Sequence, residues 1–277
     1  MKTLAQIARP LRLAGAAALI AGAGLLAGCG DKGTEDTNTV KVGTIAGPET
    51  ELMEVAKQVA KEKYDLNVDI VEFNDYVSPN MALADGSIDA NAYQHAPYME
   101  SMVKDRGFKF AIAGKTFVYP IGAYSKRFDS VDQLPQGASI ALPNDPSNEA
   151  RSLLLMDKEG LITLKDDQNA TATLDDIAEN PHDFQFKEID AAQLPRALDD
   201  VDLAFINNTF AQPAGLSLSE DALIKEGPDS PYTNLIVVRE GDENKENITH
   251  LVEAFQTDAV ADKAKELFQE AAVPGWK

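Results

Sequence analysis

A strand–helix–strand pattern near the start of the chain body most constrains the fold. Residues 40–45 alternate in polarity and are rich in β-branched side chains, which is typical of a strand. Residues 49–64 follow with apolar side chains at helical spacing, and residues 67–73 are again strand-like. Two strands joined by a helix favour a βαβ unit and therefore a parallel sheet.

The rest of the chain continues the α/β pattern. Short strands are predicted at residues 89–94, 108–112, 121–125, 139–142, 184–189, 203–206 and 235–238. Helical stretches at residues 248–256 and 259–270 close the chain.

Two apolar stretches, residues 118–124 and 232–238, bracket the middle third of the chain. They predict two α/β lobes joined by a hinge that the chain crosses twice. The lobes are expected at residues 40–124 plus 235–277 and at residues 125–234. Ligands of open α/β sheets bind beyond the carboxyl ends of the strands, so a cleft between such lobes is the expected site.

Charge and cysteine content exclude several classes of protein. The chain of 277 residues has 25 Lys and Arg against 45 Asp and Glu, a net charge of −20, which is opposite in sign to the footprint of a nucleic-acid-binding protein. With one Cys and three His, the chain cannot form an intramolecular disulfide, and a metal site built from several Cys or His side chains is excluded. With 44% hydrophobic residues, the chain can still build a packed core.

The first 28 residues read as a secretory signal peptide. Lys2, Arg9 and Arg12 precede an uncharged run over residues 13–28, which falls short of the ~20 apolar residues that cross a bilayer. The run ends in Leu-Ala-Gly and Cys29, and it resembles the lipobox of bacterial lipoproteins. That motif implies acylation of Cys29, including palmitate, and a membrane anchor. The alternative is a plain signal peptide with an incidental Cys. Residues 29–39 are expected to form a flexible tether.

The segment around residues 145–155 carries the clearest binding signal. Asp145 suits a helix N-cap and Pro146 the first helical position, so that Asn148 and Arg151 share one helix face. A helix N-terminus favours an anion, and Arg can hold a carboxylate with two parallel hydrogen bonds. The alternative is a capped turn with a solvated Arg.

Aromatic and amide side chains follow several predicted strands. The aromatic and His candidates are Tyr76, Tyr93, His95, Tyr98, Phe117 and Tyr119. Asn207 and Asn234 follow or begin strands, and an amide can serve both an ammonium and a carboxylate. Aromatic walls facing an Arg suit a small zwitterion with an apolar or thioether tail. The alternatives are core packing for the rings, a structural role for His95 and turn formation for the Asn residues.

Enzyme signatures are missing from the sequence. There is no G-x-S-x-G, Walker-type loop, H-E-x-x-H or G-x-G-x-x-G motif, and the single Cys is assigned to the lipid. We therefore expect a binding protein with no reaction, no cofactor and no metal.

Taken together, the motifs resemble the methionine-binding lipoproteins of bacterial ABC importers, the methionine subgroup of the lipoprotein-28 family. The matching segments are residues 71–80, 86–95, 115–120, 143–155, 193–196 and 230–237. The resemblance implies a two-lobed type 2 periplasmic-binding-protein fold with a two-crossover hinge. It also places Phe at position 93, where this chain has Tyr, whose added hydroxyl would need a hydrogen-bond partner.

The resemblance assigns roles to the candidates. Arg151 would bind the ligand carboxylate beside Asn148, Asn207 and Asn234 would hold the amino-acid head group, and the aromatic residues and His95 would surround the side chain. The implied partners are methionine, a membrane permease and its ATPase subunit. The body would lie in the periplasm or on the outer face of the cell envelope, held to the membrane by its lipid alone.

Three alternatives remain at this level. The same fold could bind another small amino acid or a dipeptide. The chain could instead be a surface adhesin or structural lipoprotein, or an envelope hydrolase that uses His95.

The lipidation hypothesis predicts that Cys29→Ala yields a protein without lipid that leaves the membrane fraction. Cys29 is the only thiol in the chain, so no other residue can take the acyl group through sulfur. Fractionation and intact-mass measurement test this prediction. A wild-type mass without an acyl increment would contradict it.

Overall fold

The computed structural model describes residues 38–227, 230–268 and 272–277. The predicted signal peptide, the predicted lipidation site Cys29 and all but the end of the predicted tether lie outside the described residues. From Asn38 onward, the described chain belongs to one compact unit. None of its helices is long and apolar enough to cross a membrane.

Within the described residues, six strands form the first sheet, in the order β13-β4-β12-β3-β1-β2. β1 pairs in parallel with β2 and β3, whereas β12 runs antiparallel to β3 and β4. The strands are β1 (Thr39–Ile45), β2 (Asn67–Phe73), β3 (Ala90–His95), β4 (Phe110–Val118), β12 (Thr233–Arg239) and β13 (Val273–Pro274). Helix α1 (Pro48–Tyr64) joins β1 to β2, which confirms the predicted βαβ unit.

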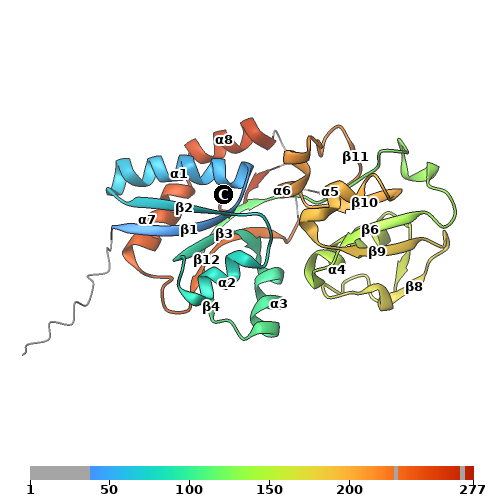
Figure 1. Ribbon diagram of the computed structural model, residues 1–277, viewed down its shortest axis with the longest axis horizontal. Coiled ribbons are helices and arrows are strands. Elements are labelled where there is room, and N and C mark those ends of the chain that lie inside the picture. Colours follow the sequence, from blue (N-terminus) through green and yellow to red (C-terminus); the bar gives the residue numbers. More distant parts are fainter. Residues whose placement is uncertain (1–37, 228–229, 269–271) are drawn as a thin grey trace, which may run out of the picture. The chain divides into compact units, whose positions relative to one another are not determined.

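Helices bury both faces of the first sheet (Figure 1). Ile236 and Val238 of β12 pack in the core formed with α1, α7 (Glu246–Phe255) and α8 (Asp258–Phe268). Leu235 and Val237 of the same strand pack on the other face, in the core formed with α2 (Ser78–Asp85) and α3 (Ala96–Arg106). A strand buried on both sides is apolar at successive positions, which explains the continuous apolar run in β12.

In the described chain, five strands form the second sheet, in the order β11-β5-β10-β6-β9. They are β5 (Gly122–Tyr124), β6 (Ser139–Pro143), β9 (Gln185–Ile189), β10 (Leu203–Ile206) and β11 (Ala222–Lys225). Helix α4 (Pro146–Lys158) packs on one face, and α5 (Leu194–Ala197) and α6 (Asn208–Ala211) pack on the other.

Smaller elements complete the second half. β7 (Thr163–Leu164) and β8 (Ile177–Glu179) form a short antiparallel pair. Single 3₁₀ turns occur at Val131–Gln133, Leu174–Asp176, Ala191–Gln193 and Gln212–Ala214.

The chain passes between the two sheets twice, once between β4 and β5 and once between β11 and β12. Pro120 lies in the first crossing and has no N–H with which to extend a strand ladder. The predicted division placed residues up to 124 in the first lobe, but β5 pairs with β10 and β11 of the second sheet. Strand pairing therefore assigns Gly122–Tyr124 to the second sheet. The two-sheet α/β architecture is confirmed, and the division into lobes stays a prediction.

Candidate ligand-binding site

A cavity lies between the two sheets, and the space outside atoms there is about 330 Å³, part of which is open solvent. It brings together every residue proposed from the sequence for ligand contact except Phe117. The lining residues are Tyr76, Tyr93, Gln94, His95, Tyr98, Tyr119, Asn148, Arg151, Asn207, Asn208, Thr209 and Asn234.

Phe117 lies instead in the core of the first sheet, where it is fully buried. Its ring packs edge-on against Trp276 at 4.8 Å and Phe255 at 6.0 Å between ring centroids. Tyr119, two residues later, lines the cavity. Proximity in sequence to the crossing therefore placed Phe117 in the predicted site, whereas packing against α7 and the chain end keeps it away.

Helix α4 positions Asn148 and Arg151 as its capping signal predicted. Asp145 is the N-cap and accepts a hydrogen bond from the backbone N–H of Asn148 at 2.9 Å. The Asn148 side chain then joins both sheets. Its Nδ2 donates to the carboxylate of Asp145, and its Oδ1 accepts from Nδ2 of Asn207 at 2.9 Å and bonds Nε2 of His95 at 3.3 Å. The Asn148 amide thus bridges elements on the two sides of the cavity.

His95 is neutral in this setting. Burial, assisted by the positive charge of Arg151, lowers the pKa of His95 to about 3. Its Nδ1 accepts a hydrogen bond from the backbone N–H of Tyr98 at 3.2 Å, so the ring proton belongs on Nε2, which donates to Asn148. A ring that gains a proton only near pH 3 is a poor general base at neutral pH, which gives the hydrolase alternative no support.

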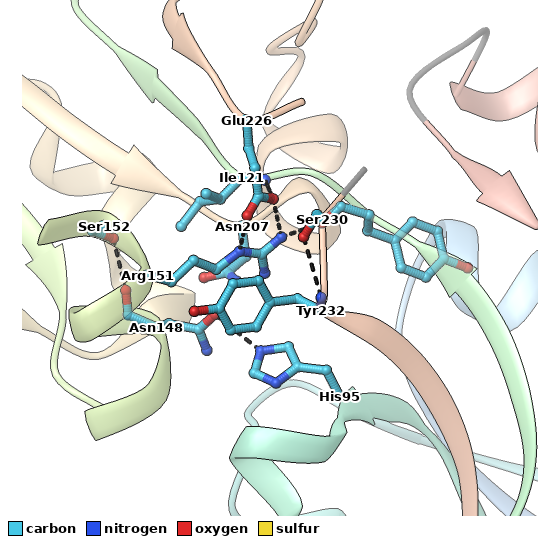
Figure 2. A network of polar contacts seen from close by, with 10 residues as sticks. His95, Ile121, Asn148, Arg151, Ser152, Asn207, Glu226, Ser230 and Tyr232 are labelled. Atoms are coloured by element: carbon cyan, nitrogen blue, oxygen red, sulfur yellow. Dashed lines mark hydrogen bonds and ion pairs between the residues drawn. The ribbon is translucent and has the colours of Figure 1, made fainter. Parts of the chain in front are cut away.

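Arg151 is a buried cation with a complete set of partners on one side (Figure 2). Its Nε donates to Oε1 of Glu226 at 2.9 Å, and its Nη2 bonds Oε2 of Glu226 and the carbonyl oxygen of Tyr119. The guanidinium carbon lies 4.4 Å from the centroid of the Tyr232 ring. Glu226 therefore occupies the Nε–Nη2 edge of the guanidinium, where a ligand carboxylate could otherwise accept two parallel hydrogen bonds.

Tyr76, Tyr93 and Tyr98 form an aromatic wall, and the hydroxyl groups of two of them donate hydrogen bonds within it. The hydroxyls of Tyr93 and Tyr98 both donate to the carbonyl oxygen of Tyr76, at 2.6 and 2.9 Å. The three rings lie 5.7–6.1 Å from one another between centroids. The hydroxyl of Tyr93 therefore has the partner that its departure from Phe required. This wall therefore offers ring surfaces to an apolar or thioether group.

Several buried polar atoms beside the cavity lack a hydrogen-bond partner among the described residues. They include Oδ1 of Asn207, Nδ2 of Asn208 and Oε2 of Glu49. Asn234 donates its Nδ2 to the carbonyl oxygen of Tyr93 at 2.7 Å. Since buried polar groups are normally bonded, such atoms next to a cavity mark where a polar ligand would supply the partner.

Five residues of the site were not predicted from the sequence. Gln94, Asn208 and Thr209 line the cavity. Glu226 and Tyr232 contact the guanidinium of Arg151. Asn208 and Thr209 directly follow Asn207, so the same strand-end signal covers them. Glu226 contacts α4 across 75 positions of sequence, and no local pattern marks it. Among the described residues there is no group of three or more His, Cys, Asp or Glu side chains arranged to hold a metal ion.

Comparison with known families identifies the architecture. Residues 40–276, nearly the whole described chain, match the model of the NlpA lipoprotein family. The chain belongs to the NlpA lipoprotein family.

Curated NlpA relatives cover nearly the full chain. A relative from Vibrio cholerae, named as a probable D-methionine-binding lipoprotein MetQ, is 54% identical over 91% of this chain and 93% of its own. The Escherichia coli K12 protein named D-methionine-binding lipoprotein MetQ is 49% identical over the same shares. These relatives are named as binding proteins.

Solved structures show the same fold. The crystal structure of a methionine-binding protein MetQ is 50% identical, covers 87% of this chain and 100% of its own, and has a TM-score of 0.86. A nutrient-binding protein from Burkholderia cenocepacia, solved bound to methionine, is 50% identical over 85% of this chain and 99% of its own, with a TM-score of 0.83. The two-sheet periplasmic-binding-protein fold expected from the sequence is therefore confirmed.

One further contact joins the two halves of this NlpA lipoprotein beside the cavity. Glu49, at the start of α1, is only 4% exposed, and its Oε1 accepts a hydrogen bond from the hydroxyl of Thr209 in α6 at 2.8 Å. Burial raises the pKa of Glu49 to about 8, which the hydrogen bond from Thr209 only partly offsets. Glu49 is therefore protonated in the folded protein near neutral pH.

Replacing Glu49 by Gln is expected to flatten the pH dependence of stability. With a pKa of about 8 when folded and about 4.5 when unfolded, this carboxyl binds more protons in the folded state between those values. The free energy of unfolding should thus fall as pH rises through this window, by up to about 1.4 kcal/mol per pH unit. Gln cannot titrate and removes that slope.

Urea unfolding of wild type and Glu49→Gln between pH 5 and 8 measures the effect. Glu62→Gln, an exposed change on the same helix, is the matched control and should keep the wild-type slope. Identical slopes for wild type and Glu49→Gln would contradict the assignment.

Proposed function

We propose that this chain is the substrate-binding lipoprotein of an ABC importer and that methionine is its ligand. The main support for the proposal is the combination of charged, amide and aromatic side chains that line the cavity. The cavity is lined by a buried guanidinium, by asparagine side chains with unpartnered atoms and by tyrosine rings. This arrangement matches a carboxylate, an ammonium and a thioether on one small molecule.

The proposal assigns each group a role. Arg151 receives the carboxylate, and Asn207, whose Oδ1 has no partner among the described residues, holds the ammonium together with Asn234. Tyr76, Tyr93, Tyr98, Tyr119 and His95 surround the thioether side chain, with Asn148 holding His95 and Asn207 in place. The names of the relatives and the methionine-bound Burkholderia structure support the same ligand.

The partners follow from this role. A permease would receive methionine from the closed protein, and a cytoplasmic ATPase would drive its transport. The acylated Cys29 would hold the body at the membrane, in the periplasm or on the outer face of the envelope.

The direct test is thermal unfolding with and without methionine. The protein is first unfolded, dialysed and refolded, so that any co-purified ligand is removed. Methionine at a hundredfold excess over its Kd should stabilise the fold by about 2.7 kcal/mol. For a protein of this size, that corresponds to a rise in Tm of about 5–10 °C.

Both enantiomers of methionine, other small amino acids and dipeptides are assayed in parallel. A Tm that no methionine enantiomer moves, with a shift caused by another amino acid or a dipeptide, would assign a different ligand to the same fold. A Tm that none of these compounds moves would favour the adhesin or structural-lipoprotein alternative.

Arg151→Ala should weaken methionine binding by about 30-fold or more. Removing one member of a buried charge pair typically costs about 2–5 kcal/mol. Arg127→Ala is the matched control, because it removes the same charge from an exposed side chain, which pairs with Asp202 in the same half of the protein. Isothermal titration calorimetry of both variants measures the difference. Equal affinities for Arg151→Ala and the control would assign Arg151 a structural role only.

A further inference from the structure

Glu226 follows β11, at the point where the chain leaves the second sheet. Both of its carboxylate oxygens are used within the protein. Oε1 accepts from Nε of Arg151 at 2.9 Å, and Oε2 accepts from Nη2 of Arg151 and from the backbone N–H of Ile121 at 3.2 Å. Ile121 belongs to the other crossing, so Glu226 ties Arg151 to both segments that connect the sheets (Figure 2).

Some of the N–H groups of Arg151 are not used by hydrogen bonds to described residues. A guanidinium has five N–H donors. Nε and one N–H of Nη2 go to Glu226, and the second N–H of Nη2 goes to the carbonyl oxygen of Tyr119. No described residue accepts a hydrogen bond from Nη1, and Arg151 lines the cavity. A ligand carboxylate can therefore bind Nη1 while Glu226 keeps its place.

The charge of the pair has a consequence for selectivity. Arg151 is 3% exposed and Glu226 13% exposed, so solvent screens their charges weakly. Together they carry no net charge. A zwitterion adds none, whereas a simple carboxylate of the same shape adds a negative charge near that of Glu226. The pair should consequently favour a zwitterion over the corresponding anion.

We propose that Glu226 is a positioning and specificity-determining residue, which holds Arg151 so that Nη1 faces the ligand and makes the site selective for zwitterions. This inference rests on the proposed function and adds a residue to it. Tyr232 supports the same geometry, because its ring lies against the guanidinium and limits its movement.

The test compares Glu226→Gln with wild type by calorimetric titration of two ligands. One is methionine, and the other is its deaminated analogue, a methylthio-butanoate that keeps the carboxylate and the thioether. Gln keeps the size of the side chain and an oxygen for Ile121, but it removes the negative charge. The ratio of the Kd of the analogue to the Kd of methionine should fall by about tenfold or more, because one buried negative charge near the ligand carboxylate is removed. Methionine itself should bind more weakly, since Arg151 loses its ionic partner.

Two further variants complete the design. Glu226→Asp keeps the charge and should keep the wild-type ratio even if its affinity for methionine drops. Glu220→Gln removes the same charge from an exposed position in the same part of the chain and should leave both affinities unchanged.

The outcomes are distinct. An unchanged ratio in Glu226→Gln, with or without a lower Tm, would reduce Glu226 to a structural role and overturn the proposal. Tighter methionine binding in Glu226→Gln would also overturn it, because Glu226 would then compete with the ligand for Arg151. If wild type binds neither compound, the proposed function fails before the variants are compared.

Discussion

The buried guanidinium of Arg151 is the group on which the organisation of the site depends. A buried cation is costly unless it is paired and hydrogen-bonded, and here its hydrogen-bond partners come from two parts of the chain distant from α4. Helix α4 supplies Arg151, the first crossing supplies the carbonyl oxygen of Tyr119, and the segment after β11 supplies Glu226. A ligand that contacts Arg151 therefore contacts a group held by both segments that connect the sheets.

Two polar contacts between described residues join the two sides at the cavity. Asn148 bonds His95 across it, and Thr209 bonds Glu49 beside it. His95 is neutral and Glu49 is protonated near neutral pH, because burial lowers the pKa of one and raises that of the other. Single hydrogen bonds of this kind contribute about 1 kcal/mol each, so a ligand that bonds both sides would add contacts of comparable strength between them.

Local signals in the sequence predicted much of this structure. The βαβ unit was visible in hydrophobic periodicity, and the N-cap Asp145 with Pro146 correctly placed Asn148 and Arg151 at the start of α4. These features depend on residues within a few positions of each other, where backbone geometry and capping dominate.

Contacts over long sequence distances were not predictable in the same way. Glu226 is one of 45 acidic residues, and only the folded chain shows that it meets Arg151. Phe117 and Tyr119 are both aromatic and near the first crossing, yet packing against Trp276 sends one into the core while the other lines the cavity. Strand β5 looked like part of the first lobe because its partners β10 and β11 lie far along the chain.

The central claim is that a zwitterionic ligand binds between the sheets with its carboxylate on the free side of Arg151. A crystal structure of the protein with methionine tests this most directly. The account predicts the carboxylate within hydrogen-bond distance of Nη1 of Arg151, with Glu226 still bonded to Nε and the thioether against the tyrosine wall. A carboxylate bound to Nε in place of Glu226, or methionine outside the cavity, would contradict it.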